Sequence, residues 1–189
     1  MSLRYALLDL LAGDPMSGYD LTGRFTVSLA NVWPAQHSQI YPELARLVQD
    51  GLIVQTGEGP RGRKVYSITP AGVDAIPAWL RETEPDYTIR AESLLRIFCL
   101  WALPTDEALA HLAHDRGEFT RHRDELATMI EKVDWGDNLS RRGARLSIEF
   151  GHRYYCELVE YVDWAAAQIE AGALRAGGPV PAPTLKRTL

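Results

Sequence analysis

The sequence contains little cysteine and no long apolar segment. Its two cysteines, Cys99 and Cys156, are far apart in the chain and do not have the CxxC spacing of redox or zinc sites. We interpret both as packed small hydrophobic residues, with a disulfide or a reactive thiol as the alternative. No window approaches the ~20 apolar residues of a membrane span, and the first residues do not resemble a cleaved signal peptide. We therefore expect a cytoplasmic protein without a membrane partner.

Enzyme motifs are also missing. The sequence has no G-x-S-x-G nucleophile motif, and its GEGPRG segment precedes a predicted strand rather than the helix that a phosphate-binding loop requires. One face of a predicted helix carries four side chains that could bind a metal, namely His111, Asp115, Glu118 and His122. Their spacing does not match H-E-x-x-H, and a solvated charged face explains them equally well. We expect neither catalysis, nor a cofactor, nor a bound metal.

Positive charge is not in excess, which counts against nucleic-acid binding judged on composition alone. The chain has 20 Lys and Arg against 25 Asp and Glu, a net charge of −5. The position of the charges matters more than their sum. The segment RGRK, residues 61–64, places three cations in four residues at a Gly/Pro-rich turn. These cations suit DNA phosphates or a narrow minor groove, and the alternative is an ordinary solvated turn.

Hydrophobic spacing predicts three helices near the N-terminus. Leucines at helical intervals over residues 3–11 indicate the first helix, and a Gly-Asp-Pro turn ends it. Ser17 and Asp20 fit a capping box, so a second helix should follow and run to about residue 29. The third helix should begin near Ser38 and end at Gly51. Its predicted buried face consists of Ile40, Leu44, Leu47 and Val48.

After the third helix the periodicity becomes that of strands. The runs LIVQT (52–56) and KVYSI (64–68) are rich in β-branched residues and flank the Gly/Pro turn, which predicts a β-hairpin with a basic tip. Thr69 and Pro70 suit an N-cap and a first helical position, so a fourth helix should follow, with a kink at Pro77. Three helices, a hairpin and a returning helix make a winged helix-turn-helix, in which the third helix enters the DNA major groove.

The C-terminal half predicts two long helices, at about residues 105–133 and 141–171, with heptad repeats. An intramolecular bundle would explain the repeats. A second apolar stripe, which includes Phe150, Tyr154 and Tyr161, requires a further packing partner, and winged-helix proteins that read paired half-sites are commonly dimers. We therefore predict a homodimer. The seven-residue spacing assigns its contacts to Ile148, Tyr155, Leu158, Val162 and Ile169.

These elements predict a mainly α fold with a small β-hairpin. We expect an N-terminal winged helix-turn-helix DNA-binding domain at residues 1–84 and a C-terminal helical dimerisation and effector domain at residues 85–173. Residues 174–189 are rich in Gly and Pro without a period, so they should form a disordered tail.

Several segments resemble the PadR family of bacterial transcriptional regulators, in its longer branch with an extended helical C-terminal domain. They are YALLDLLAGDPMSGYDL, SQIYPELARLVQDGLI and RGRKVYSITPAGVDAIPAWL, and IRAESLLRIFCLWAL resembles the start of that C-terminal domain more loosely. The resemblance implies a winged-helix dimer that represses promoters and, in several members, releases them on binding a small molecule.

The candidate DNA contacts are residues with hydrogen-bond donors on the third helix and on the hairpin, which we call the wing. They are Gln36, His37, Ser38, Gln39, Tyr41, Arg46, Arg61, Arg63 and Lys64. We expect Tyr41 and Lys64 to contact phosphates. Arg61 and Arg63 should touch the DNA backbone or the minor groove, and the remaining residues should face the major groove.

An aromatic surplus in the C-terminal half suggests a pocket for a planar or apolar ligand, between the domains or at the dimer seam. The candidate residues are Trp101, Trp135, His152, Tyr154, Tyr155, Tyr161 and Trp164, although ordinary core packing would explain most of these rings. The predicted partners are therefore double-stranded operator DNA, a second copy of the chain and a small-molecule effector. The alternatives are a winged-helix module for protein contacts and a repressor that needs no ligand.

Overall fold

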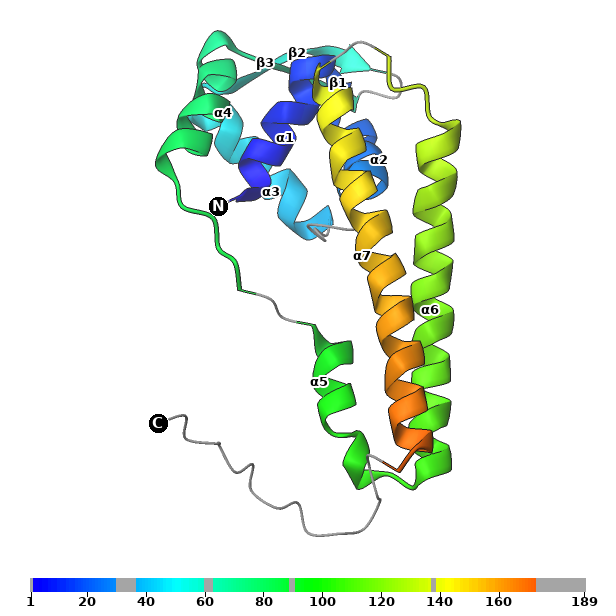
Figure 1. Ribbon diagram of the computed structural model, residues 1–189. Coiled ribbons are helices and arrows are strands. Elements are labelled where there is room, and N and C mark those ends of the chain that lie inside the picture. Colours follow the sequence, from blue (N-terminus) through cyan, green and yellow to red (C-terminus); the bar gives the residue numbers. More distant parts are fainter. Residues whose placement is uncertain (1, 30–36, 60–62, 89–90, 137–138, 173–189) are drawn as a thin grey trace. The chain divides into compact units, whose positions relative to one another are not determined.

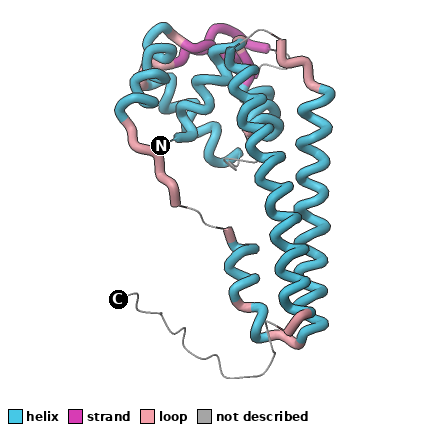
Figure 2. The backbone as a smooth tube through the Cα atoms, viewed as in Figure 1, coloured by secondary structure: helices cyan, strands magenta, loops and turns pink. Residues whose placement is uncertain are grey.

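The structure is mainly helical, with a small sheet near the N-terminus. It is a computed structural model that describes residues 2–29, 37–59, 63–88, 91–136 and 139–172 (Figure 1). In chain order its elements are α1 (Ser2–Gly13), β1 (Met16–Ser17), α2 (Gly18–Ser28), α3 (His37–Gln49), β2 (Ile53–Gly59), β3 (Arg63–Ile68), α4 (Pro70–Glu82), α5 (Glu92–Phe98), the 3-10 helix η2 (Leu100–Ala102), α6 (Thr105–Lys132) and α7 (Leu139–Glu170). Figure 2 shows how much of the described chain is helix, which confirms the predicted fold class. None of the described helices has the length and apolar composition needed to cross a membrane.

The chain divides into two compact units, each built from two stretches of sequence. The first unit comprises Met1–Tyr87 and Asp124–Arg153, and the second comprises Thr88–Arg123 and Tyr154–Leu189. Both long helices, α6 and α7, therefore contribute to both units. The division of the linear chain at residues 84/85 stays a prediction, and the predicted disordered tail lies outside the described residues.

The sheet of the first unit has one strand more than the predicted hairpin. Strands β2 and β3 pair antiparallel with Ile53 opposite Ile68, and β1 pairs with the other edge of β3, with Met16 opposite Tyr66. Strand β1 has only two residues, which is too short for an alternating pattern to show in the sequence. Strand β3 begins at Arg63, so this arginine is fixed within the ladder.

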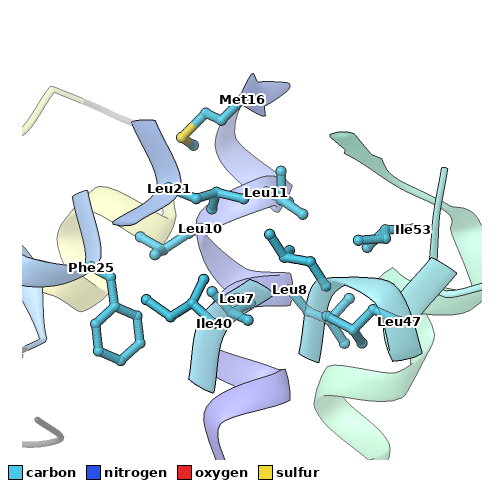
Figure 3. Close-up of a cluster of buried hydrophobic side chains, with 11 residues drawn as sticks. Leu7, Leu8, Leu10, Leu11, Met16, Leu21, Phe25, Ile40, Leu47 and Ile53 are labelled. Atoms are coloured by element: carbon cyan, nitrogen blue, oxygen red, sulfur yellow. The ribbon is translucent and has the colours of Figure 1, made fainter. Parts of the chain in front are cut away.

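An apolar core joins α1, α2, α3 and the start of β2 (Figure 3). Its buried members are Leu7, Leu8, Leu10, Leu11, Met16, Leu21, Phe25, Ile40, Leu44, Leu47 and Ile53. The predicted buried face of α3 is thus confirmed for three of its four residues. Val48 is 40% exposed, because it lies at the edge of the stripe and close to the end of the helix. Full burial of a leucine or isoleucine side chain stabilises the fold by roughly 1.5–3 kcal/mol. The three buried residues of α3 therefore fix the orientation of this helix on the core.

Both predicted N-caps are present. The Ser17 hydroxyl accepts a hydrogen bond from the Asp20 amide at 3.2 Å and donates one to the Asp20 carboxylate at 2.7 Å. Thr69 Oγ1 accepts from the Gly72 amide at 3.1 Å. Each contact satisfies a backbone donor that the first turn of a helix leaves free. Helix α4 continues through Pro77 as one element.

The second unit is organised by the heptad positions of α6 and α7. Its buried cluster includes Leu112, Phe119, Leu158, Val162 and Ile169. Arg116 occupies a companion heptad position of α6 and binds Asp163 of α7 through two hydrogen bonds, Nε to Oδ1 at 2.6 Å and Nη2 to Oδ2 at 3.2 Å. This pair explains how an arginine fits beside an apolar seam: its guanidinium remains at the exposed edge.

The residues predicted for dimerisation lie mostly inside the single chain. Four are buried, namely Ile148, Leu158, Val162 and Ile169, and Tyr155 packs against the cluster of the second unit. The heptads of α6 and α7 therefore form an intramolecular seam. The second stripe of α7 is the one that remains exposed, with Tyr161 at 37% and Trp164 at 58%, so this stripe is not fully packed within the described part of the chain.

Both cysteines are free thiols in the structure. Cys156 is partly buried, but Cys99 is exposed, so its interpretation as a packed residue is wrong. Cys99 lies at the C-cap of α5, where its amide donates to the Arg96 carbonyl at 2.9 Å. This position at a helix end, next to η2, leaves its side chain in solvent.

Candidate nucleic-acid interface

Helix α3 presents a polar surface opposite its buried leucines. Ser38 and Gln39 are exposed in its first turn, while Ile40, Leu44 and Leu47 are fully buried. A helix with 3.6 residues per turn places these two sets on different faces. Gln36 and Arg61 lie outside the described residues, and so does the side chain of His37. The described part of the predicted α3 surface is thus accessible to a partner.

Tyr41 lies where α3 meets α2 and β3, and it is 46% exposed. Its ring covers Gly18, the first residue of α2: a Cβ placed on Gly18 would come within 2.8 Å of Tyr41 Cε1. Burial raises the pKa of the Tyr66 phenol of β3, and the nearby Tyr41 phenol raises it further. The close approach to Gly18 gives the Tyr41 ring a defined position against α2.

Arg46, a candidate for base contact, lies in a charged cluster. Its Nη1 is 3.1 Å from Oε2 of Glu43, and Glu43 Oε1 is also 3.5 Å from Arg4 Nε of α1. Arg4 forms a further pair with Asp50. The cluster contains two cations and two carboxylates, and a bidentate contact of Arg46 with another partner would compete with its pairing to Glu43.

The wing carries Arg63 and Lys64 at the start of β3. The Arg63 guanidinium carbon lies 4.1 Å from the centroid of the Tyr19 ring of α2, which is a cation–π contact. Lys64 is exposed, and successive strand residues point to opposite faces. Arg63 is thus held against the helix-turn-helix, while Lys64 extends from the other face of the wing.

Tyr19 was not among the predicted contacts, although it connects α2 to the wing. It is 58% exposed, in contrast to Leu21 and Phe25 of the same helix, which form the core. The sequence does show that Tyr19 is out of phase with the buried positions of its helix, which indicates an exposed aromatic side chain. Its partner is 44 residues away, however, and only the fold brings the two together.

The seven predicted ligand residues are distributed over several places. Trp135 lines a cavity of about 290 Å³ in the first unit, together with Arg24 and Arg141. Tyr161 and Trp164 line another of about 260 Å³ in the second unit. The Tyr155 ring lies 5.0 Å from that of His122 and 5.6 Å from that of Tyr154, Trp101 is partly exposed, and His152 is half-buried.

A further cavity, of about 320 Å³, lies in the first unit between α1, α4 and the first turns of α7. Tyr5 and Trp79 form one wall, with their rings stacked at 4.5 Å and 5°. Asp9 also lines it. No sequence pattern indicates this cavity, because its lining residues come from four separate segments of the chain.

The four side chains considered as metal ligands do not form a common site in the described part of the chain. Glu118 pairs with Arg121 at 2.8 Å, and the same guanidinium lies 3.1 Å from His122 Nε2. Arg121 lowers the pKa of Glu118, first through the hydrogen bond and then through its charge. In the part of the chain that the structure describes, no group of three or more His, Cys, Asp or Glu side chains is placed to hold a metal. His111 and Asp115 are half-buried on the same helix.

Comparison with protein families assigns the two halves of the chain. The transcriptional regulator PadR-like family matches residues 7–78, and the virulence activator alpha C-terminal family matches residues 89–170. The negative transcriptional regulator PadR of Bacillus subtilis is 37% identical over 110 residues. That match covers 56% of this chain and 60% of the relative, which is less than two thirds of the relative's length.

Solved structures of the same relative have a similar fold over nearly their whole length. The crystal structure of Bacillus subtilis PadR in complex with operator DNA matches with a TM-score of 0.77 at 28% identity, covering 89% of this chain and 99% of that one. The structure of the same protein in complex with p-coumaric acid matches with a TM-score of 0.73 at 28% identity, covering 90% and 99%. The chain belongs to the PadR-like family, a family of transcriptional regulators rather than enzymes, in the branch that carries the virulence activator alpha C-terminal domain.

Proposed function

We propose that the protein is a homodimeric repressor that binds operator DNA through α3 and the wing and is released by a small aromatic ligand. The observation that carries this proposal is the chain of contacts from α3 to the wing. The Tyr41 ring of α3 covers Gly18 of α2. The residue after Gly18, Tyr19, is exposed and contacts the Arg63 guanidinium of the wing. Bacillus subtilis PadR, 28% identical, has been solved with operator DNA. Because the target is chromosomal DNA, we place the protein in the cytoplasm.

The side chains divide into those that read bases and those that hold the backbone. Ser38 and Gln39 lie in the first turn of α3, and the N-terminal turn is the part of a recognition helix that reaches base edges. The Gln39 amide can make two hydrogen bonds to adenine. The phenol of Tyr41 suits a phosphate, and Arg63 suits a phosphate or the minor groove. Gln36, His37 and Arg61 stay predicted contacts, because their side chains lie outside the described part of the chain. Lys64 adds a phosphate contact from the other face of the wing.

Salt-dependent binding tests the DNA contact. Labelled DNA from upstream of the protein's own gene is titrated at several salt concentrations, and affinity is read by fluorescence anisotropy. Arg63→Ala should weaken binding to all sequences and flatten the plot of log K against log salt by roughly one unit, because one phosphate contact is lost. Arg96→Ala is the matched control: it removes the same charge from α5, where Arg96 pairs with Glu92.

Two different results would contradict two different parts of the proposal, namely the assignment of the wing and the binding of DNA. An unchanged slope for Arg63→Ala, with normal binding by the wild type, would remove Arg63 from the interface. Wild-type binding that does not respond to salt would favour the alternative, a winged-helix module for protein contacts.

The proposed dimer uses the exposed stripe of α7. Tyr161 and Trp164 line an apolar cavity together with Leu100 and Ile169 of the same unit, and exposed aromatic area of this kind is typical of an interface. In a two-fold dimer the two α3 helices would read half-sites ~34 Å apart. The double variant Tyr161→Glu/Trp164→Glu should sediment as a monomer and lose operator binding. Tyr87→Glu, which changes an exposed tyrosine outside α7, should remain dimeric.

The proposed effector is a planar aromatic compound, because Bacillus subtilis PadR has been solved with p-coumaric acid and this chain has aromatic-lined cavities of suitable size. A ligand releases DNA only if it binds the DNA-incompetent state more tightly. Moving the protein from 99:1 to 1:99 requires about 5.5 kcal/mol of difference in binding free energy. If no aromatic compound weakens the protein–operator complex, the ligand-independent repressor is the remaining alternative.

A further inference from the structure

The cavity between α1, α4 and the first turns of α7 has one charged wall residue, and that residue is an acid. Asp9 lines it, and the remaining lining side chains are apolar or carry only neutral polar groups, as Tyr5, Trp79 and Ser147 do. No lysine, arginine or histidine is among the lining residues. A carboxylate in a partly enclosed site repels an anionic ligand, because Coulomb interactions are stronger there than in bulk water.

Asp9 has a fixed position in this wall. Its Oδ2 accepts a hydrogen bond from the Ser140 hydroxyl at 2.9 Å, and the same hydroxyl lies 3.1 Å from the Asp9 carbonyl oxygen. Ser140 is the second residue of α7. A carboxylate has about four acceptor sites, so Asp9 can accept further hydrogen bonds from a ligand while it keeps Ser140.

The second feature of the cavity is its aromatic wall. The Tyr5 and Trp79 rings are stacked on each other, 5° apart, and both line the space. Aromatic rings pack against further rings edge to face as well as by offset stacking, and a cavity of about 320 Å³ has room for one ring with a short substituent. The site therefore combines an aromatic wall with an anionic acceptor.

We infer that this cavity binds a planar aromatic compound that carries a neutral or cationic hydrogen-bond donor, and that it discriminates against aromatic carboxylates. This ligand class differs from the acid that Bacillus subtilis PadR was crystallised with. The role of the ligand as effector rests on the proposed function. Its binding in the cavity does not depend on DNA.

The test compares p-coumaramide with p-coumarate, which differ in charge but hardly in shape. Calorimetric titration of the wild-type protein should give a dissociation constant at least about tenfold lower for the amide. Asp9→Asn retains an acceptor for Ser140 and removes the charge, so the difference between the two probes should shrink or reverse. Equal or tighter binding of p-coumarate by the wild type would overturn the inference, as would an unchanged preference in Asp9→Asn.

A pair of glycine variants locates the binding site. Gly143 lines the cavity, and a Cβ on it would meet nothing within 4 Å, so Gly143→Leu should fill the space and weaken p-coumaramide binding at least about tenfold. Gly117→Leu is the control, because Gly117 has equal room on α6 of the second unit. If Gly143→Leu binds the amide as well as the control does, the ligand occupies another site, such as the cavity at Trp135, and the inference fails.

An operator-release assay separates this inference from the proposed function. Binding of the amide that is sensitive to Gly143→Leu but does not weaken the operator complex would contradict the effector role and leave the cavity assignment intact. Release of the operator by p-coumarate and not by the amide would likewise contradict the effector role of this cavity and leave the repressor intact.

Discussion

Replacing Gly18 by alanine should displace Tyr41 and so weaken operator binding with little loss of stability. The added Cβ would lie 2.8 Å from Tyr41 Cε1, 3.4 Å from Cζ and 3.5 Å from Leu44 Cδ1. A contact under 3 Å requires movement, and the Tyr41 ring, half exposed, is the group that can move. Overpacking costs about 1–3 kcal/mol when the surroundings are rigid. Here we expect about 1 kcal/mol at most, partly offset by the better helix propensity of alanine.

The effect on DNA binding should be larger than the effect on folding. A hydrogen bond from the Tyr41 phenol to a phosphate is worth about 1.5–3 kcal/mol, as for other bonds to charged groups. Its loss should therefore weaken operator binding about tenfold or more at low salt. Gly23→Ala in the same helix is the matched control, because its Cβ would meet nothing within 4 Å. It should stabilise the protein by about 0.5–1 kcal/mol and leave operator affinity unchanged.

Urea unfolding and fluorescence anisotropy on labelled operator DNA measure the two quantities. A double-mutant cycle with Tyr41→Phe isolates the mechanism: in that background Gly18→Ala should cause little further loss of affinity, because the displaced hydroxyl is already absent. Wild-type affinity for Gly18→Ala would refute the assignment of Tyr41 to the interface. A full additional loss in the Tyr41→Phe background would show that Gly18 acts on DNA by another route.

Three further predictions concern stability. Gly72→Ala should destabilise by more than about 3 kcal/mol in urea unfolding, because its Cβ would lie 2.2 Å from the backbone oxygen of Leu52, which cannot move aside. The raised pKa of Tyr66 predicts a stabilisation that is fully present below about pH 10, the unfolded pKa, and lost as pH rises through the folded pKa. Tyr66→Phe should remove this alkaline dependence, and an unchanged pH profile would contradict it. Arg116 lowers the pKa of Asp163, through the hydrogen bond first, so the pair should stabilise above the unfolded pKa of about 3.9 and cease to do so as pH falls through the folded pKa. Since both groups are exposed, the difference between wild type and Asp163→Asn should shrink in 1 M salt.

The features predicted correctly from the sequence are the local ones. The caps at Ser17 and Thr69 depend on residues three positions apart, and both are present in the structure. The buried face of α3 follows from a helical period. Strand β1 was missed because two residues carry no period. A feature could be predicted when the residues that determine it lie within one helical turn or one secondary-structure element.

The features that could not be predicted require contacts between distant segments. The heptads of α6 and α7 indicated a packing seam, but intramolecular and intermolecular seams need the same apolar spacing. Only the structure shows Leu158 and Val162 in the core of a single chain. The contact of Tyr19 with Arg63, and the meeting of Asp9 with Trp79 in one cavity, likewise join separate elements. Neither leaves a spacing rule in the sequence.

We expect Arg46 to read a base, and we propose that the charged cluster around it holds this arginine ready in an acidic protein. Glu43 is shared between Arg46 and Arg4, and Arg4 also binds Asp50, so Glu43 keeps a cationic partner when Arg46 leaves. The exposed pair that Arg46 gives up is worth about 0.2–1 kcal/mol. A bidentate contact with guanine contributes about 1–3 kcal/mol of discrimination. We therefore expect the exchange to favour DNA only where the correct base accepts both hydrogen bonds, and Arg46 to stay with Glu43 elsewhere.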